Sequence, residues 1–130
     1  MAIGTLITST IHLVFAGLWT GSVLFVALAG LPEGGLGRLR QISRASARLL
    51  LLTGGHQAAM QYGGGRLTGT TAGWAVLAMV ALWLVLAGLV EVGASKYEDG
   101  GPEAARPFFT AGAVVSLLLL VDAGLLAGVL

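Results

Sequence analysis

Cysteine is absent from the 130 residues, and charged side chains make up only 10% of them. Without cysteine the chain has no disulfide framework, no thiolate metal site and no cysteine nucleophile. A soluble domain usually carries about 25% charged residues, so the low charge argues against a soluble domain. The formal net charge of +1 at pH 7 gives no electrostatic footprint for a nucleic acid, and we expect no nucleic-acid partner.

Apolar residues are abundant, at 56% of the chain. This excludes disorder, which needs low hydrophobicity and high net charge. A helix that crosses a bilayer needs roughly 20 mostly apolar residues, and the uncharged stretches leave room for four such helices. We therefore predict an all-α integral membrane four-helix bundle, with the lipid bilayer as its surroundings and one membrane domain over residues 1–130. The predicted helices cover residues 4–29, 42–62, 71–95 and 107–130.

Proline and glycine mark the predicted breaks between these helices. The segment from Leu31 to Gly35 ends the first helix, Gly63–Gly65 ends the second, and Asp99–Pro102 forms the third loop. Pro107 suits the first turn of the last helix, where a missing amide donor costs nothing. Loops this short predict that sequential helices pack as antiparallel neighbours. The first segment lacks a positive n-region, so we expect a retained helix rather than a cleaved signal peptide.

Basic side chains are distributed unequally among the three loops. Arg66 is the basic residue of the second loop, whereas six others surround the first and third loops. These six are Arg38, Arg40, Arg44, Arg48, Lys96 and Arg106. Lys and Arg concentrate in short cytoplasmic loops, so we predict a multi-pass protein of the cell (plasma) membrane with both termini outside.

Four ionisable side chains fall within the predicted spans, where they are costly and are functional candidates. Glu91 is one turn from the cytoplasmic end of the third helix, so it can reach the interface or pair with an arginine of the first loop. Asp122 lies about 12 Å from the outer end by helical rise. The Asp122 carboxylate can be hydrated, can accept hydrogen bonds from hydroxyl groups of the first helix, or can pair with a histidine. The other two ionisable residues are His12 and His56.

The two histidines have similar depths when counted from the outer ends of their helices. His12 is 11 residues after Met1 and His56 is 10 residues before Arg66, which places each about 15 Å deep. A count from the inner loop instead gives an offset of about 13 to 20 Å. We follow the outer count and predict that the two histidines share one site on adjacent antiparallel helices.

The surroundings of the histidines favour a large, flat ligand. Small residues beside a histidine let a macrocycle approach the backbone, and aromatic side chains can pack against its edge. On this basis we predict that a cofactor contacts His12, His56, Trp19, Gly55 and Met60. A metal ion would be held by His12, His56 and Asp122. Glycines at small-xxx-small spacing, Gly17 with Gly21 and Gly124 with Gly128, are typical of helix–helix packing, and we predict that Gly17 and Gly21 line such a contact.

Three short motifs occur along the chain in a recognisable order. They are His12-Leu13 followed by Ala16, Trp19, Gly21 and Phe25; Ile42-Ser43-Arg44 followed by the run from Leu49 to Gly54; and Arg106-Pro107-Phe108 before a final helix. Together they resemble the copper-resistance D (CopD-like) membrane protein family, over nearly the whole chain as one four-helix unit. The first helix is also similar to that of the membrane protoporphyrinogen oxidase family, which is associated with haem b.

The CopD-like resemblance implies copper handling or transport, and it carries over to His12 and extends to His56. Both families usually place a lysine in the third helix, where this chain has Ala78-Met79. This departure argues mainly against the oxidase activity. Three functions therefore stay open. The chain binds haem b through His12 and His56 for electron transfer, handles copper through the same histidines, or is a packing subunit without chemistry of its own. We expect a redox or transport component rather than a stand-alone enzyme, and other membrane subunits or a second copy as partners.

Overall fold

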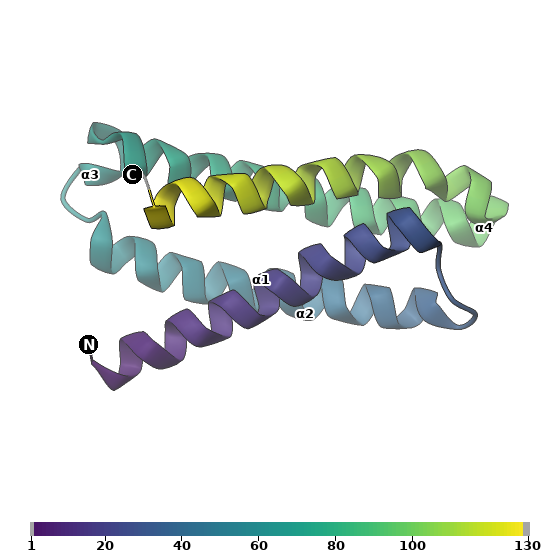
Figure 1. Cartoon of the computed structure of the whole chain (residues 1–130), viewed down its shortest axis with the longest axis horizontal. Helices are drawn as coiled ribbons and strands as arrows, with labels where there is room; N and C mark the ends of the chain where they lie inside the picture. Colours follow the sequence, from purple (N-terminus) through teal and green to yellow (C-terminus); the bar gives the residue numbers. More distant parts are fainter. Residues whose placement is uncertain (1, 129–130) are drawn as a thin grey trace.

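The structure is a computed structural model that describes residues 2–128, and nearly all of these residues are helical. Within residues 2–128 there are four helices: α1 (Ile3–Ala29), α2 (Gly35–Gln61), the short α3 (Arg66–Gly69) and α4 (Thr71–Gly128) (Figure 1). No strand occurs in the described part of the chain. The prediction of an all-α protein is confirmed.

Helix α4 consists of two arms that fold back on each other at Gly101 (Figure 1). The φ of 77° and ψ of −169° at this residue belong to a backbone region that essentially only glycine adopts. The predicted third loop is therefore a one-residue break: the first arm covers residues 71–100 and the second 102–128. Pro102, rather than the predicted Pro107, occupies the first turn of the second arm.

Helix α2 begins at Gly35, seven residues before the predicted start at residue 42. The predicted boundary follows the apolar stretch of the sequence, whereas the helix extends beyond that stretch. Two tertiary contacts hold the additional turns. Leu39 is buried in the core, and the Arg40 guanidinium forms an ion pair with Glu98 near the end of the first arm of α4.

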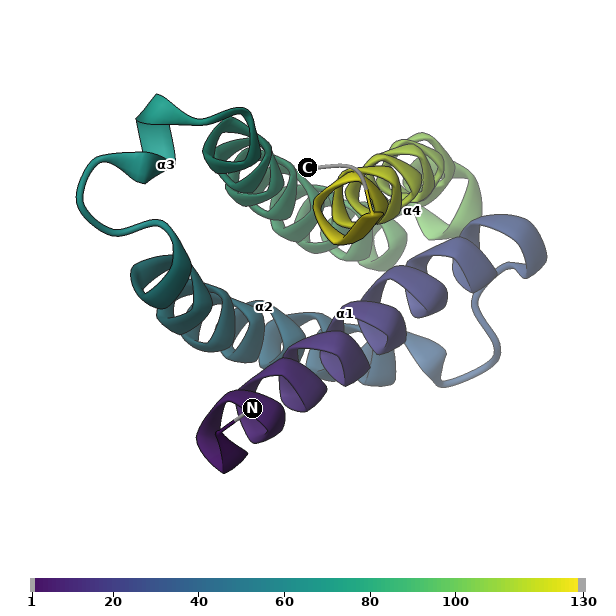
Figure 2. The ribbon, with the colours of Figure 1, turned by 60° about the vertical axis from the view of Figure 1, so that its left-hand side comes forward.

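The helices are arranged in two pairs. In Figures 1 and 2 the two arms of α4 lie side by side, and α1 and α2 lie together on the other side of the molecule. The start of α1, the whole of α3 and the end of α4 lie at one end of the molecule, which we call the α3 end. The turn between α1 and α2 and the bend at Gly101 lie at the opposite end, the Gly101 end. This arrangement determines how far each side chain lies from the α3 end and from the Gly101 end.

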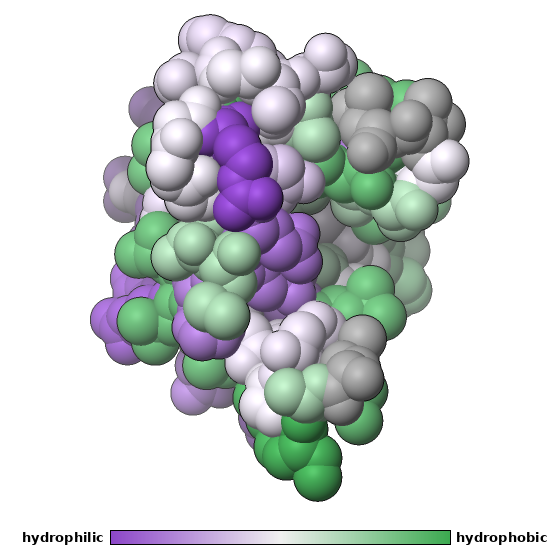
Figure 3. All heavy atoms as spheres, turned by 90° about the vertical axis from the view of Figure 1, so that its left-hand side faces the viewer, coloured by the Kyte–Doolittle hydropathy of each residue, from purple (hydrophilic) through white to green (hydrophobic). Residues whose placement is uncertain are grey.

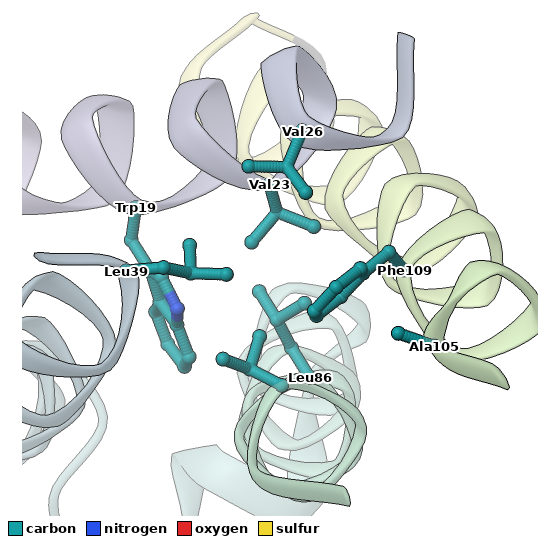
Figure 4. Packing of buried hydrophobic residues seen from close by; sticks show 8 residues of the cluster. Trp19, Val23, Val26, Leu39, Leu86, Ala105 and Phe109 are labelled. Carbon is teal, nitrogen blue, oxygen red and sulfur yellow. The ribbon is translucent and has the colours of Figure 1, made fainter. Parts of the chain in front are cut away.

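The apolar core is concentrated toward the Gly101 end, and every helix pair contributes to it (Figure 4). Two glycines permit the close approach of helices there: a Cβ at Gly93 would lie 2.7 Å from the Phe109 ring, and one at Gly112 would lie 3.1 Å from Val23 Cγ1. The core consists of Trp19, Val23, Val26, Leu39, Leu86, Val90, Ala105 and Phe109.

The prediction that Gly17 and Gly21 line a helix–helix contact is wrong for contacts within the described chain. Both residues are exposed, and a Cβ built at either would meet no atom within 4 Å. The reason is the phase of α1, whose buried face carries Trp19 and Val23. Residues two positions apart on a helix are about 200° apart around its axis, so the glycines face away from the bundle.

Two of the described helices, α1 and α4, are long and apolar enough to cross a membrane. Helix α2 does not share this property, because its first half carries arginine at positions 38, 40, 44 and 48.

Candidate functional site in the seam between α1 and α2

The imidazole of His12 lies half-buried between α1 and α2. Its Nδ1 atom is 2.8 Å from the hydroxyl oxygen of Thr53. Its Cε1 atom faces Gly54, where a built Cβ would lie only 3.2 Å away. Glycine at position 54 therefore provides the space that the imidazole occupies, so this small residue accommodates the His12 side chain itself.

The hydrogen-bonding pattern around Thr53 determines which nitrogen of His12 carries the hydrogen. The Thr53 hydroxyl also lies 2.7 Å from the carbonyl oxygen of Leu49, and it donates its single hydrogen there. Both contacts are satisfied together only when His12 Nδ1–H donates to the Thr53 oxygen. His12 Nε2 then carries the free lone pair, which is the atom that binds a metal or accepts a proton.

A second hydrogen bond joins the same two helices about one turn nearer the α3 end. Gln57 Nε2 donates to Ser9 Oγ at 3.0 Å. Ser9 and His12 are three residues apart on α1, and Thr53 and Gln57 are four apart on α2, so each pair occupies one helix face. We call these four residues the polar seam. Sequence reasoning singled out His12 but missed Thr53 and Gln57, although their four-residue spacing in an otherwise apolar segment was visible.

His56 lies at nearly the depth of His12, at the exposed edge of the α2 face that carries Thr53. Since Thr53 contacts His12 and His56 is three residues further along, the two histidines differ in depth by about 4.5 Å. This agrees with the count from the outer ends and not with the larger inner-loop offset. His56 is about 60° around α2 from Thr53, is exposed, and has no hydrogen-bond partner among residues 2–128.

Trp19, which was predicted to pack against a cofactor, is a core residue. Its side chain has an exposed fraction of 0% and packs in the apolar cluster with Val23, Leu39 and Leu86 (Figure 4). Its Nε1 atom is buried without a hydrogen-bond partner in the described structure. Trp19 therefore stabilises the bundle nearer the Gly101 end and is not part of the polar seam.

The remaining predicted site residues form no hydrogen bond with His12, whose partner in the described structure is Thr53. Gly55 and Met60 are exposed, and Met60 retains 69% of its accessible surface. Asp122 is half-buried, and its Oδ2 atom has no hydrogen-bond partner among the described side chains. Across residues 2–128, no three histidine, aspartate or glutamate side chains lie together as metal ligands. The structure thus does not assemble His12, His56 and Asp122 into one three-ligand site.

Glu91 pairs with an arginine near the first loop, which confirms one of the two roles expected for it. Arg44 Nε and Nη2 donate to the two carboxylate oxygens of Glu91 at 2.8 Å and 3.1 Å. Such a two-bond geometry fixes the orientation of both groups. With the Arg40–Glu98 pair, it connects α2 to the first arm of α4.

The fold and the seam together define an all-helical protein with two helices apolar enough to cross a membrane and a histidine oriented between α1 and α2. At the α3 end, hydrophilic side chains gather along the middle of the surface, with apolar residues beside them (Figure 3). The chain matches no protein-family model, no curated protein and no solved structure.

Proposed function

We propose that the chain is an integral membrane protein in which α1, α2 and the two arms of α4 each cross the bilayer. The surface supports this proposal because large apolar side chains are exposed along these helices, including Leu13 at 75% and Leu28 at 87%. Soluble monomers rarely expose apolar patches larger than a few hundred Å². In a bilayer the same side chains contact lipid, and their exposure has no cost.

The proposed orientation places the Gly101 end in the cytoplasm and the α3 end outside. The support is the distribution of basic residues, since six of the seven lie on the segments that flank the first turn and the Gly101 bend. The start of α1 and the end of α4 then lie outside the cell membrane, because both are at the α3 end (Figure 1).

The function we propose is haem b binding for electron transfer within the membrane, in which His12 and His56 would hold the haem through their ring nitrogens. One observation carries the proposal: Thr53 Oγ1 lies 2.8 Å from His12 Nδ1. With Nδ1–H donated to Thr53, His12 Nε2 presents its lone pair. Histidines that bind metals almost always donate their other ring N–H to a nearby oxygen. When bound, the haem supplies one-electron redox chemistry, while His12 binds it and Thr53 orients His12.

The ligand set favours haem over a bare copper ion. A porphyrin supplies four nitrogen ligands itself, so the protein needs to add only one or two axial groups. Copper handling, which the CopD-like resemblance implies, would depend on more side chains from the chain. His56 is accessible on the flank of α2, but no third histidine, aspartate or glutamate joins the two histidines in the described residues.

The experiment that tests the proposal is the visible absorption spectrum of the protein purified from its native membrane, together with a metal analysis. We expect a Soret band and split α and β bands. Both signals should disappear in His12→Ala and in His56→Ala, because each variant removes one of the two histidines that would hold the haem. Thr53→Val should lower haem affinity by about 10- to 100-fold, since it removes the group that orients His12.

Gln57→Ala is the matched control, because it removes the other hydrogen bond of the polar seam without touching His12. Its spectrum should equal that of the parent. A colourless protein that contains copper would replace the proposal with copper handling. A protein with neither signal would instead be a packing subunit of a larger membrane assembly.

A further inference from the structure

A groove separates α2 from the first arm of α4 toward the Gly101 end, and it contains a cavity of about 250 Å³. One wall carries Arg44, Arg48 and Leu51 from α2, and the other carries Trp83, Ala87 and Glu91 from α4. The spacing of three or four residues places each set on one face of its helix.

The groove contains two arginines but only one carboxylate. Glu91 neutralises Arg44 through the two hydrogen bonds described above. Arg48 is one turn along α2, is exposed, and has no ion pair or hydrogen bond within residues 2–128. The groove therefore carries one positive charge without a counter-charge, and an arginine at the membrane boundary attracts anionic lipid headgroups.

The depth of the groove follows from the uncharged part of the first arm. Residues 71–90 carry no charge, and 20 residues rise about 30 Å, which is the thickness of the hydrocarbon layer. Glu91 then lies at the cytoplasmic boundary of that layer, and Arg44 lies beside it. Arg48 is one turn deeper, from where its long stem can bring the guanidinium back to the boundary.

The deeper part of the groove is apolar and has a fixed wall. Trp83 Nε1 donates to the carbonyl oxygen of Ala47 at 3.1 Å, so the indole is held in place with its only donor satisfied. Leu51, which is more than half exposed, lies on the opposite wall. The groove thus combines a cationic mouth at the boundary with an apolar channel that leads into the bilayer.

We propose that this groove binds one anionic phospholipid of the cytoplasmic leaflet. The phosphate contacts Arg48, whose planar guanidinium suits two-bond recognition of phosphate oxygens. The first part of an acyl chain lies along Leu51 and Trp83. An anionic lipid is favoured over a zwitterionic one because the unpaired charge of Arg48 attracts a headgroup with a net negative charge. The inference depends on the membrane part of the proposed function and is independent of haem.

The test is native mass spectrometry of the protein after reconstitution in phosphatidylcholine bilayers that contain one-fifth phosphatidylglycerol. The parent protein should retain phosphatidylglycerol in preference to phosphatidylcholine. Arg48→Gln should retain about fivefold less, which corresponds to the loss of one basic contact near the surface. The matched control is Arg38→Gln, an equal charge change on the same helix at an exposed position outside the groove, and it should retain the parental amount.

A second variant acts from the other wall. Ala87→Leu fills the cavity with apolar atoms, leaves every charge in place and should displace the lipid as well. Equal losses in Arg48→Gln and Arg38→Gln would overturn the proposal, since a general surface charge would then explain retention. Displacement by inorganic phosphate would also overturn it, because the site would bind a free anion.

Alkaline carbonate extraction separates this failure from failure of the proposed membrane location. If carbonate removes the protein from membranes, both proposals fall. If the protein stays in the membrane fraction but retains no phosphatidylglycerol, only the lipid site is wrong.

Discussion

His12 depends on two neighbours that act in different ways. Thr53 orients the ring through Nδ1, while Gly54 leaves the space that the ring occupies. The distance of 3.2 Å from a built Cβ at position 54 to His12 Cε1 is tight enough that any larger side chain must push the imidazole aside. The orientation of the His12 ring therefore depends on residues of α2 as well as on α1.

Gly54→Leu should expel the His12 ring from the seam and lower stability by about 1–3 kcal/mol, the usual cost of overpacking. Gly55→Leu is the matched control, because it is the adjacent residue in the same helix and its built Cβ meets nothing within 4 Å. Thermal unfolding in detergent should show a lower melting temperature for Gly54→Leu than for Gly55→Leu. Equal melting temperatures would mean that the seam is not packed as described.

At the residue scale, the histidine depth and the Glu91 ion pair could be predicted from the sequence, because both depend on counting along helices of known rise. The role of Trp19 could not be predicted, since an aromatic residue on an apolar helix suits a protein core and a cofactor equally well. Thr53 was missed for a related reason: a threonine within a helix usually bonds to its own backbone, and only tertiary packing shows that it also meets His12.

The helix α4 shows how a single glycine divides one helical segment into two. Gly101 has a positive φ with an extended ψ, and this conformation costs other residues about 1–3 kcal/mol. The sequence predicted a loop at Asp99–Pro102 correctly in position but too long in extent. Glycine and proline indicate where a helix is interrupted, but tertiary packing decides how many residues leave the helix.

Gly101→Ala should destabilise the protein by about 1–3 kcal/mol, because alanine is strained in this conformation. The control is Gly88→Ala, which changes the same residue type within the first arm at an exposed helical position with open space around it. That variant should be stabilised by about 0.5–1 kcal/mol through its higher helix propensity. Opposite shifts in melting temperature would support the described bend, whereas equal shifts would argue against it.

Helix α2 joins two environments within one element. Its first half carries four arginines and pairs with carboxylates of α4, while its second half carries the polar seam. Its start could not be read from apolarity, because the buried Leu39 and the Arg40–Glu98 ion pair extend the helix beyond the apolar segment. Likewise, the spacing of Gly17 and Gly21 places two small residues on one helix face. It does not tell whether that face packs against another helix.

For the whole molecule, the two ends differ in the number of basic residues as well as in chain connectivity. The Gly101 end carries most of the basic residues, and the α3 end carries Arg66. This difference underlies the proposed orientation, which single-cysteine labelling can test directly because the chain has no cysteine of its own.

Thr68→Cys and Glu33→Cys place single cysteines at exposed positions of the α3 end and the Gly101 end. In intact cells, a membrane-impermeant maleimide should label Thr68→Cys at once and Glu33→Cys only after lysis. Asp99→Cys, which is exposed beside the Gly101 bend, should behave like Glu33→Cys. Labelling of all three from one side would exclude the proposed crossing of the bilayer.

The uneven distribution of the core has a dynamic consequence. All the buried apolar side chains of the described chain lie in the helix halves nearest the Gly101 end, whereas the α3 end is joined across α1 and α2 by the polar seam. Local opening is easiest where few apolar contacts must be broken. We therefore expect the helices to separate more readily at the α3 end than at the Gly101 end.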